Sequence, residues 1–281
     1  MTDNPAPAPA PAPEPRQRAF PMPWLVVVPA IAVVVTLLVA TPGNLADKAD
    51  LVGYAVCHRI SSHSISIAGR QLPLCARCTG TFIGAAVGFL GQAVVLRRRR
   101  ASEFPPPLIL TILVGFILLW AGDGLNSYME LVGGSHLYEP QNWLRLSTGS
   151  LNGLAMSALV YPVFNFTLWR NPSTERTIRG IKDLGVLVLM EAGLVVLVIV
   201  RWPPLLYPLV VLSAAGVLTL LTVTITMLVL MITRRENAAD NWRQSVVPLL
   251  AGFTLSLILV TAIDLARYVA TGTLTGIPPL Q

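Results

Sequence analysis

The stretch TGTFIGAAVGFLGQAVVLRRRR, residues 79–100, decides the fold class. Residues 79–96 contain no charged side chain, and four arginines follow directly. An uncharged run of this length can cross the hydrocarbon core of a bilayer as a helix, and arginines gather at the cytoplasmic ends of such helices. The stretch therefore predicts a transmembrane helix that is anchored at its cytoplasmic end.

The composition of the whole chain agrees with a membrane protein. Of the 281 residues 54% are hydrophobic and 12% are charged, and the formal net charge is +6. A soluble domain carries about a quarter of its residues as charged side chains, and a disordered chain is poor in hydrophobic residues. No basic face with interleaved aromatic residues lies outside the membrane flanks, so nucleic-acid binding is not expected.

Apolar runs of about 17 to 25 residues recur along the chain. Seven candidate spans are predicted, at residues 24–41, 79–96, 105–122, 147–169, 184–200, 204–232 and 246–266. With the N-terminus inside and the C-terminus outside, 13 of the 20 Lys and Arg residues fall on the inner side, as the positive-inside rule requires. We predict an all-α, polytopic protein of the cytoplasmic membrane with about seven transmembrane helices.

Two segments outside the spans complete the predicted organisation. Residues 1–19 alternate Pro and Ala, which predicts a disordered cytoplasmic tail before a helical membrane domain at 20–281. A cleaved signal peptide is the competing reading, but its apolar region is usually about 7 to 15 residues. The apolar run from Trp24 to Ala40 is 17 residues long, which favours a retained helix.

The first outer loop, residues 42–78, holds all three cysteines and two of the three histidines, His58 and His63. Residues 64–67 alternate polar and apolar, a turn follows at 68–70, and residues 71–74 return toward LCARCTG. This pattern is typical of a short hairpin.

The cysteines are candidate metal ligands. A CxxC pair, Cys75 and Cys78, can turn two thiolates toward one ion, and Cys57 can supply a third corner of a tetrahedron. The fourth ligand could be His58, His63, His136 or water. Zinc is the predicted metal, with Cys57, His58, Cys75 and Cys78 as candidate ligands in a structural or a catalytic site.

Redox chemistry is the main alternative for the same cysteines. A helix N-terminus lowers the pKa of a thiol, and a neighbouring cysteine can exchange with it. The chain could therefore be a quinone-linked thiol–disulfide oxidoreductase with a lipid-like or quinone substrate. A plain structural disulfide with one spare thiol is the third possibility.

The second outer loop, residues 123–146, lies on the same predicted face. Asp123 and Arg145 are candidate catalytic residues that could instead pair with each other, and Asn142 is a candidate substrate-binding residue. Within the fifth predicted span, Glu191 is a functional candidate because burying a carboxylate in a membrane is costly. It could also be a protonated group that bonds between helices. Asp264 and Arg267 could bridge along one helix face.

Glycines at four-residue spacing mark two of the predicted helices. Gly80, Gly84 and Gly88 leave one smooth face, and Gly149 and Gly153 leave another. Such faces allow close helix packing. We expect both helices to make tight contacts, which could join them to each other.

A group of these residues carries a family resemblance. Cys57-His58, Gln71 and the LCARCTG core at 74–80 resemble the signature of a domain-of-unknown-function family of predicted integral membrane proteins in bacteria and archaea. The family also carries Asp-Gly and Asn-x-x-Arg-x-x-Thr-Gly, which match residues 123–124 and 142–149 here. This chain has Tyr138 where the family tends to place an additional Arg. The resemblance covers about residues 57–153 and implies a multi-helical membrane fold, but no established reaction.

Two further functions remain open from the sequence. A small-solute transporter would use Glu191 rather than the cysteines, but no internal repeat with paired broken helices is recognisable. A membrane scaffold or partner subunit would need the metal only to hold its outer loop. The lipid bilayer is the one partner that all of these functional hypotheses predict.

Overall fold

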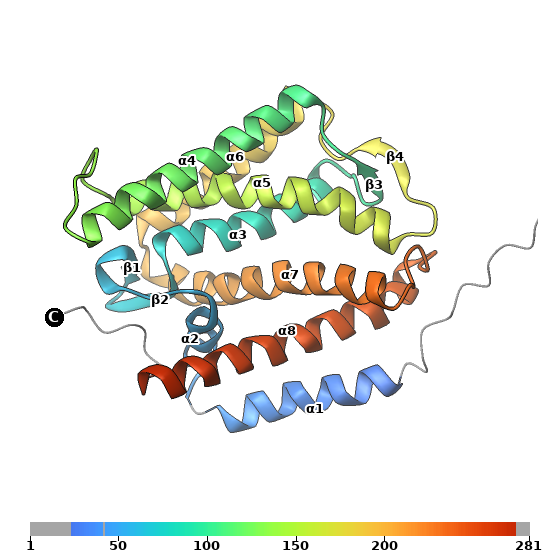
Figure 1. The fold of residues 1–281 in the computed structure, drawn as a ribbon, viewed down its shortest axis with the longest axis horizontal. Helices are drawn as coiled ribbons and strands as arrows, with labels where there is room; N and C mark the ends of the chain where they lie inside the picture. Colours follow the sequence, from blue (N-terminus) through green and yellow to red (C-terminus); the bar gives the residue numbers. More distant parts are fainter. Residues whose placement is uncertain (1–23, 42, 274–281) are drawn as a thin grey trace, which may run out of the picture.

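The structure is a computed structural model that describes residues 24–41 and 43–273, and it forms a bundle of long helices (Figure 1). The helices are α1 (Trp24–Ala40), α2 (Leu45–Val56), α3 (Ala76–Leu90), α4 (Pro107–Leu131), α5 (Asn142–Leu168), α6 (Ile181–Val200), α7 (Leu206–Ile232) and α8 (Trp242–Thr271). The strands are β1 (Ser64–Ile67), β2 (Arg70–Cys75), β3 (Ala101–Glu103) and β4 (Ser173–Arg176). A π-helical turn at Gly91–Val95 extends α3, and 3₁₀ turns lie at Ser61–His63 and Pro203–Leu205.

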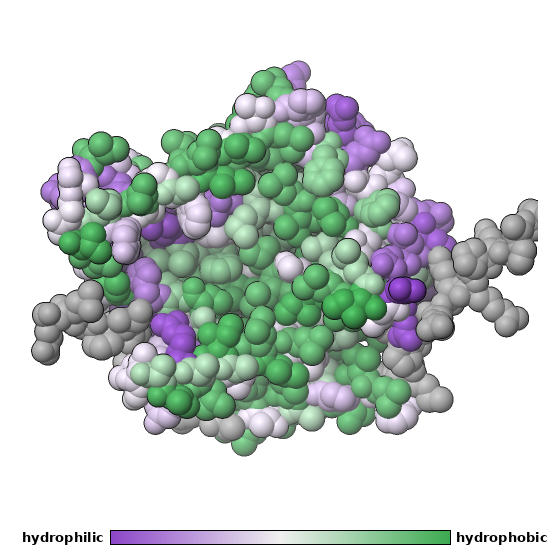
Figure 2. All heavy atoms as spheres, in the orientation of Figure 1, coloured by the Kyte–Doolittle hydropathy of each residue, from purple (hydrophilic) through white to green (hydrophobic). Residues whose placement is uncertain are grey.

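The predicted all-α, polytopic class is confirmed. Among the described residues six helices are long and apolar enough to cross a membrane, and α1 is a shorter apolar helix of 17 residues. Figure 2 shows hydrophobic side chains over the middle of the molecule and hydrophilic ones toward its two ends. The predicted tail at 1–19 lies outside the described residues.

Helices α3 and α5 pack backbone to backbone through glycines, as their spacing predicts. A Cβ added at Gly80 would overlap the carbonyl oxygen of Leu146, and one at Gly149 would overlap that of Arg77. A Cβ at Gly153 would overlap the carbonyl oxygen of Thr81. Only hydrogen fits at these positions, so the two helices are joined to each other at the centre of the bundle.

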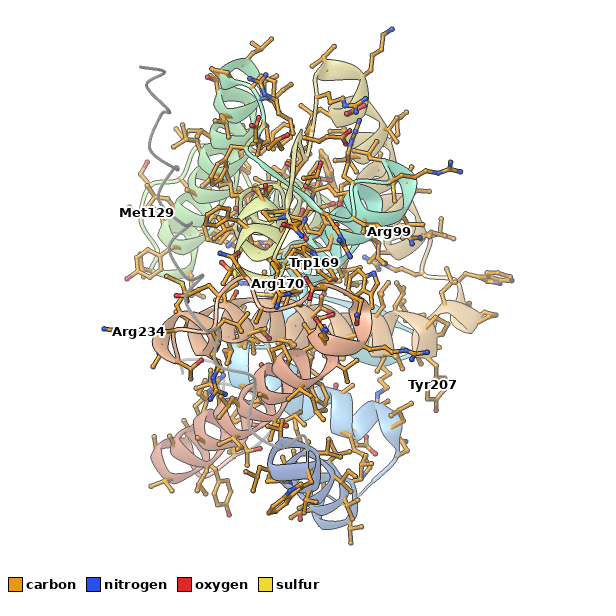
Figure 3. The ribbon with its side chains drawn as sticks, turned by 90° about the vertical axis from the view of Figure 1, so that its right-hand side faces the viewer. Arg99, Met129, Trp169, Arg170, Tyr207 and Arg234 are labelled. Carbon is orange, nitrogen blue, oxygen red and sulfur yellow. The ribbon has the colours of Figure 1, made fainter. Side chains whose placement is uncertain are left out.

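The predicted inner and outer segments lie at opposite ends of the bundle. The cysteine end, defined by Cys57, Cys75 and Cys78, holds the β1–β2 hairpin and the α4–α5 connection (Figure 1). The arginine end, defined by Arg97–Arg100, holds β3, β4 and the α7–α8 connection. Figure 3 looks onto the arginine end, where Arg99, Arg170 and Arg234 are labelled. That this end faces the cytoplasm remains a prediction of the charge rule.

Several predicted boundaries were wrong. The outer loop at 42–78 contains a helix, α2, which begins with a capping box. Asn44 accepts hydrogen bonds from the amides of residues 46 and 47, and the Asp47 carboxylate accepts one from the Asn44 amide. The loop at 123–146 is also shorter than predicted, because α4 continues to Leu131 and α5 begins at Asn142. Asp123 and Arg145 therefore stand on helices.

The predicted hairpin is confirmed. Strands β1 and β2 pair antiparallel, with Ile67 opposite Arg70. Ala68 and Gly69 both have positive φ, +50° and +78°, as in the tight turns that suit the twist of a hairpin. The parallel pair of β3 and β4 at the arginine end was not predicted.

The α3–α5 contact can be tested with Gly149→Ala. The added methyl group must push the helices apart, and overpacking of this kind costs about 1–3 kcal/mol. We expect a lower thermal midpoint for the detergent-solubilised variant. The matched control is Gly115→Ala, because nothing lies within 4 Å of a Cβ added at Gly115 of α4. Equal midpoints for the two variants would contradict the close contact.

Candidate functional site

Three different elements bring the cysteines together. Cys57 ends α2, Cys75 is the last residue of β2, and Cys78 lies in the first turn of α3. Helix α2 is held close to β2, because a Cβ at Gly53 would overlap the backbone of Pro73. The three residues share one buried cluster, and Cys57 and Cys75 are 4% and 3% exposed.

The Cys57 sulfur is the hydrogen-bond acceptor of this cluster. It accepts the backbone amides of Cys75 at 3.2 Å and of Arg59 at 3.5 Å. Hydrogen bonds from the Cys75 and Cys78 side chains lower the pKa of the Cys57 thiol, and the same contact with Cys57 raises the pKa of the Cys75 thiol. The arrangement favours a negative charge on Cys57.

His58 completes a group of possible metal ligands. One ligand atom each from Cys57, His58 and Cys75 lie within 4.8 Å of one another. The Nδ1 atom of His58 accepts the backbone amide of Ile60 at 3.0 Å. The ring also makes an edge-to-face contact with His63, with 5.7 Å between the ring centroids.

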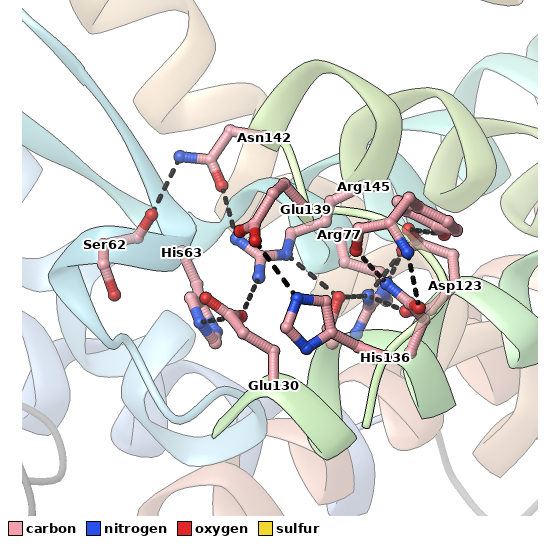
Figure 4. A network of polar contacts seen from close by, with 12 residues as sticks. Ser62, His63, Arg77, Asp123, Glu130, His136, Glu139, Asn142 and Arg145 are labelled. Carbon is pink, nitrogen blue, oxygen red and sulfur yellow. Dashed lines mark hydrogen bonds and ion pairs between the residues drawn. The ribbon is translucent and has the colours of Figure 1, made fainter. Parts of the chain in front are cut away.

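A network of charged and polar side chains, in which Asp123, Ser127 and Arg145 are buried, includes Arg77 of the CxxC segment (Figure 4). Arg77, between Cys75 and Cys78 in the chain, donates to the Asp123 carboxylate at 2.5 and 3.1 Å and to the Ser127 hydroxyl at 2.9 Å. The Tyr138 hydroxyl donates to the other Asp123 oxygen at 2.8 Å. Burial and the neighbouring Asp123 raise the pKa of Tyr138 to about 12, so its phenol stays protonated.

Arg145 belongs to the same network but does not pair with Asp123, contrary to one of the predictions. It donates to Ser127 at 3.3 Å and to Glu130 at 3.4 Å. It also donates to the Asn142 side-chain oxygen at 3.0 Å, while the Asn142 amide group donates to the carbonyl oxygens of Ser62 and Ser64. Asn142 therefore ties the hairpin to Arg145.

His63 lies between the network and His58. Its Nε2 atom is 4.0 Å from a Glu130 carboxylate oxygen. Burial, with the nearby Arg145 as a second cause, lowers the pKa of His63 to about 4, so the ring is neutral at pH 7. His136 instead pairs with Glu139 at 3.2 Å and is not part of the Cys57–His58–Cys75 group.

The remaining candidates, Glu191, Asp264 and Arg267, lie outside the polar network. Glu191 on α6 is 2% exposed and accepts a 2.5 Å hydrogen bond from Ser150 of α5. Asp264 and Arg267 on α8 form no ion pair among the described residues, so that prediction was wrong. The Arg267 guanidinium instead donates to the carbonyl oxygens of Tyr54 and Cys57.

Comparison with known proteins finds a family match over part of the chain. Residues 57–159 match a family described as a predicted membrane protein (DUF2085). The resemblance to predicted membrane proteins is therefore confirmed for the segment that runs from Cys57 into α5. The matched segment holds all three cysteines and the whole polar network.

The chain is also similar to archaeal proteins that are themselves described as uncharacterized. One, from Methanothermobacter thermautotrophicus, is 29% identical over 104 residues, which is 37% of this chain and 83% of the relative. Another, from Methanocaldococcus jannaschii, is 28% identical over 109 residues, which is 39% of this chain and 64% of the relative. No solved structure matches the chain.

Sequence reasoning missed five members of the polar network. Arg77 lies within LCARCTG, where the sequence suggests only a spacer between two cysteines. Tyr138 was noted only because the family tends to have an arginine at its position. Ser127 and Glu130 belong to no motif, and His63 was predicted only as a possible metal ligand. A four-residue count from Asp123 to Ser127 along one helix face is the signal that could have found the hydroxyl.

The Arg77–Asp123 ion pair can be tested with Asp123→Leu. Asp123 is 3% exposed, and removing one partner of a buried ion pair costs about 3–5 kcal/mol because the other charge stays buried. We expect a strongly lowered thermal midpoint, and adding Arg77→Met should restore much of it. Glu139→Leu is the control, because that carboxylate is 82% exposed. A midpoint equal to the control would show that the pair contributes nothing to stability.

Proposed function

We propose that this chain is an integral membrane protein with a zinc site at its outer face, held by the thiolates of Cys57, Cys75 and Cys78. The observation that carries the proposal is the convergence of the three thiols. The Cys57 and Cys75 sulfurs lie within 4.8 Å of each other, in a group of possible ligands that also includes His58 but not Cys78. Cys78 contacts the same sulfurs. Thiolate and imidazole groups are the ligands that zinc prefers in proteins.

The backbone around Cys57 supports a thiolate ligand. Two amides point at its sulfur, from Cys75 and Arg59. Such N–H···S bonds stabilise negative charge, and a metal ligand must be deprotonated. Because the three residues come from α2, β2 and α3, a shared ion would also fasten these elements to one another.

His58 fits the role of a hydrogen-bond donor better than that of a fourth ligand. Its Nδ1 lone pair already accepts the Ile60 amide, so the proton of the neutral ring is on Nε2. That ring offers no free lone pair to a metal. A three-thiolate site would then keep an open fourth position, as catalytic zinc sites do.

An ion with an open position supplies Lewis-acid chemistry: it polarises a bound carbonyl group or water. The neighbouring Asp123 and Arg145 would orient a polar substrate or lipid headgroup there. Their side chains are held by Arg77, Ser127 and Asn142, so the network is preorganised. Glu130, the ion-pair partner of Arg145, is 37% exposed.

Metal analysis of the detergent-purified protein tests the proposal. We expect about one zinc per chain, with all three thiols masked until denaturation. Cys75→Ser should lose stoichiometric zinc altogether, because a thiolate ligand is removed. The absence of bound metal from protein prepared with added zinc would contradict the site.

The role of His58 is a separate prediction. His58→Ala should keep stoichiometric zinc and weaken it by about 10- to 100-fold, as loss of a supporting hydrogen bond does. The matched control is His136→Ala, which should leave zinc affinity unchanged. Loss of zinc from His58→Ala to the extent seen in Cys75→Ser would make His58 a ligand and the site closed.

The mutual contact of the three thiols also favours a second candidate function, thiol–disulfide exchange. Two thiols would form one disulfide and pass two electrons and two protons to a quinone, which becomes a quinol. The same samples separate the two functions. A redox protein would show one disulfide and one free thiol, no metal, and quinone-dependent turnover.

A further inference from the structure

A groove between α1, α2 and α8 supports an inference beyond the proposed zinc site. It encloses a cavity of about 350 Å³. Its lining is almost entirely apolar and includes Leu37, Leu38, Leu51, Val52, Leu257 and Leu265. Helices α1 and α8 lie side by side in Figure 1, and the groove continues along their contact past Val33 and Ile258.

One polar atom in this groove lacks a partner. Asp264 is 9% exposed and lines the cavity, and its Oδ1 atom has no hydrogen bond within the described part of the chain. A buried polar atom without a partner costs about 1–3 kcal/mol. Oδ1 itself has less than 1 Å² of accessible surface, so a ligand in the groove would bond to the other carboxyl oxygen of Asp264.

The cations at this end of the groove are already engaged. The Lys48 ammonium group donates to the carbonyl oxygens of Leu38 and Thr41 and to the Thr41 hydroxyl. Arg267 donates to two carbonyl oxygens and stacks on Tyr54, 4.1 Å from the ring centroid. A phosphate headgroup would therefore meet the Asp264 carboxyl without an uncommitted cation, which disfavours a phospholipid.

We infer that the groove binds an isoprenoid quinone, with its ring beside Asp264 and its tail along the α1–α8 contact. The ring is neutral, and its oxygen can pair with a carboxyl group in either state. A quinone carbonyl accepts a hydrogen bond from a protonated carboxyl, and a quinol hydroxyl donates to a carboxylate. The single apolar chain suits a groove that is open to the hydrocarbon core.

The position of Asp264 relates this groove to the cysteines. Arg267 lies one helical turn further along α8, and its guanidinium contacts the backbone carbonyl of Cys57. The quinone ring would thus lie on the opposite side of α2 from the polar network. Binding alone accounts for these observations, and it does not depend on whether the thiols hold zinc.

Photolabelling of the purified full-length protein in phosphatidylcholine nanodiscs tests the inference. The probe is an azidobenzoquinone with a two-unit isoprenoid tail. We expect label on α1 and α8 peptides, and protection by an excess of a short-chain ubiquinone. Thr261→Trp, which fills the groove, should lower labelling at least fivefold.

Asp264 variants test the hydrogen bond. Asp264→Leu should weaken protection by ubiquinone about tenfold, which corresponds to the loss of about 1.4 kcal/mol. Asp264→Asn, which keeps an amide donor and acceptor, should stay within about threefold of the unchanged protein. Each variant is first checked for an unchanged elution volume and thermal midpoint.

A second lipid-facing groove provides the matched control. It lies between α7 and α8, is lined by Ala215, Leu218, Leu249 and Phe253 among others, and has no carboxylate. Ala215→Trp there should leave labelling unchanged. Equal labelling of both grooves, or protection that is insensitive to Asp264→Leu, would show only partition into lipid and would overturn the inference. Zinc content measured on the same samples keeps this result distinct from the outcome for the metal site.

Discussion

The backbone contact between α3 and α5 is the constraint on which the rest of the site depends. Carbonyl oxygens of each helix lie where a side chain of the other would otherwise be, at Gly80 and Gly149. The same two helices carry Cys78 and Arg145, and α3 begins directly after Cys75. A separation larger by one methyl group would move the cysteines and the arginine relative to each other. The glycines therefore determine the geometry of the site as well as the packing of the bundle.

The charged network depends on this packing because its members would be costly to bury singly. Arg77 pairs with Asp123, Arg145 pairs with Glu130, and the Ser127 hydroxyl accepts from both arginines. The two cations and two anions balance in formal charge. A buried ion is tolerated when its partner and its hydrogen bonds are all in place, so these residues act as one unit. Substituting any one of them should disturb the others.

The spans, the hairpin and the glycine contact could be predicted because each has a local pattern. Helix α2 was missed because it is short and only weakly apolar, although its capping box at Asn44 and Asp47 is legible in the sequence. The partner of Asp123 could not be predicted. Choosing Arg77 over Arg145 depends on the angle and register at which α3, α4 and α5 meet, and no local pattern encodes either quantity.

In the proposed zinc site, the chemistry of the cysteines depends on where the His58 imidazole carries its proton. The 3₁₀ turn at Ser61–His63 begins just after Ile60, whose amide is directed at His58 Nδ1 and so assigns the ring proton to Nε2. In the proposed zinc site, a proton in that position would make His58 a hydrogen-bond donor rather than a ligand, and a three-thiolate ion would keep one open position. If the ring turned and lost the Ile60 bond, the same four side chains would close the tetrahedron and the ion would only hold the loop. In the proposed site, the local backbone at residues 58–60 would therefore decide whether His58 is a ligand, and with it whether the zinc is reactive or structural.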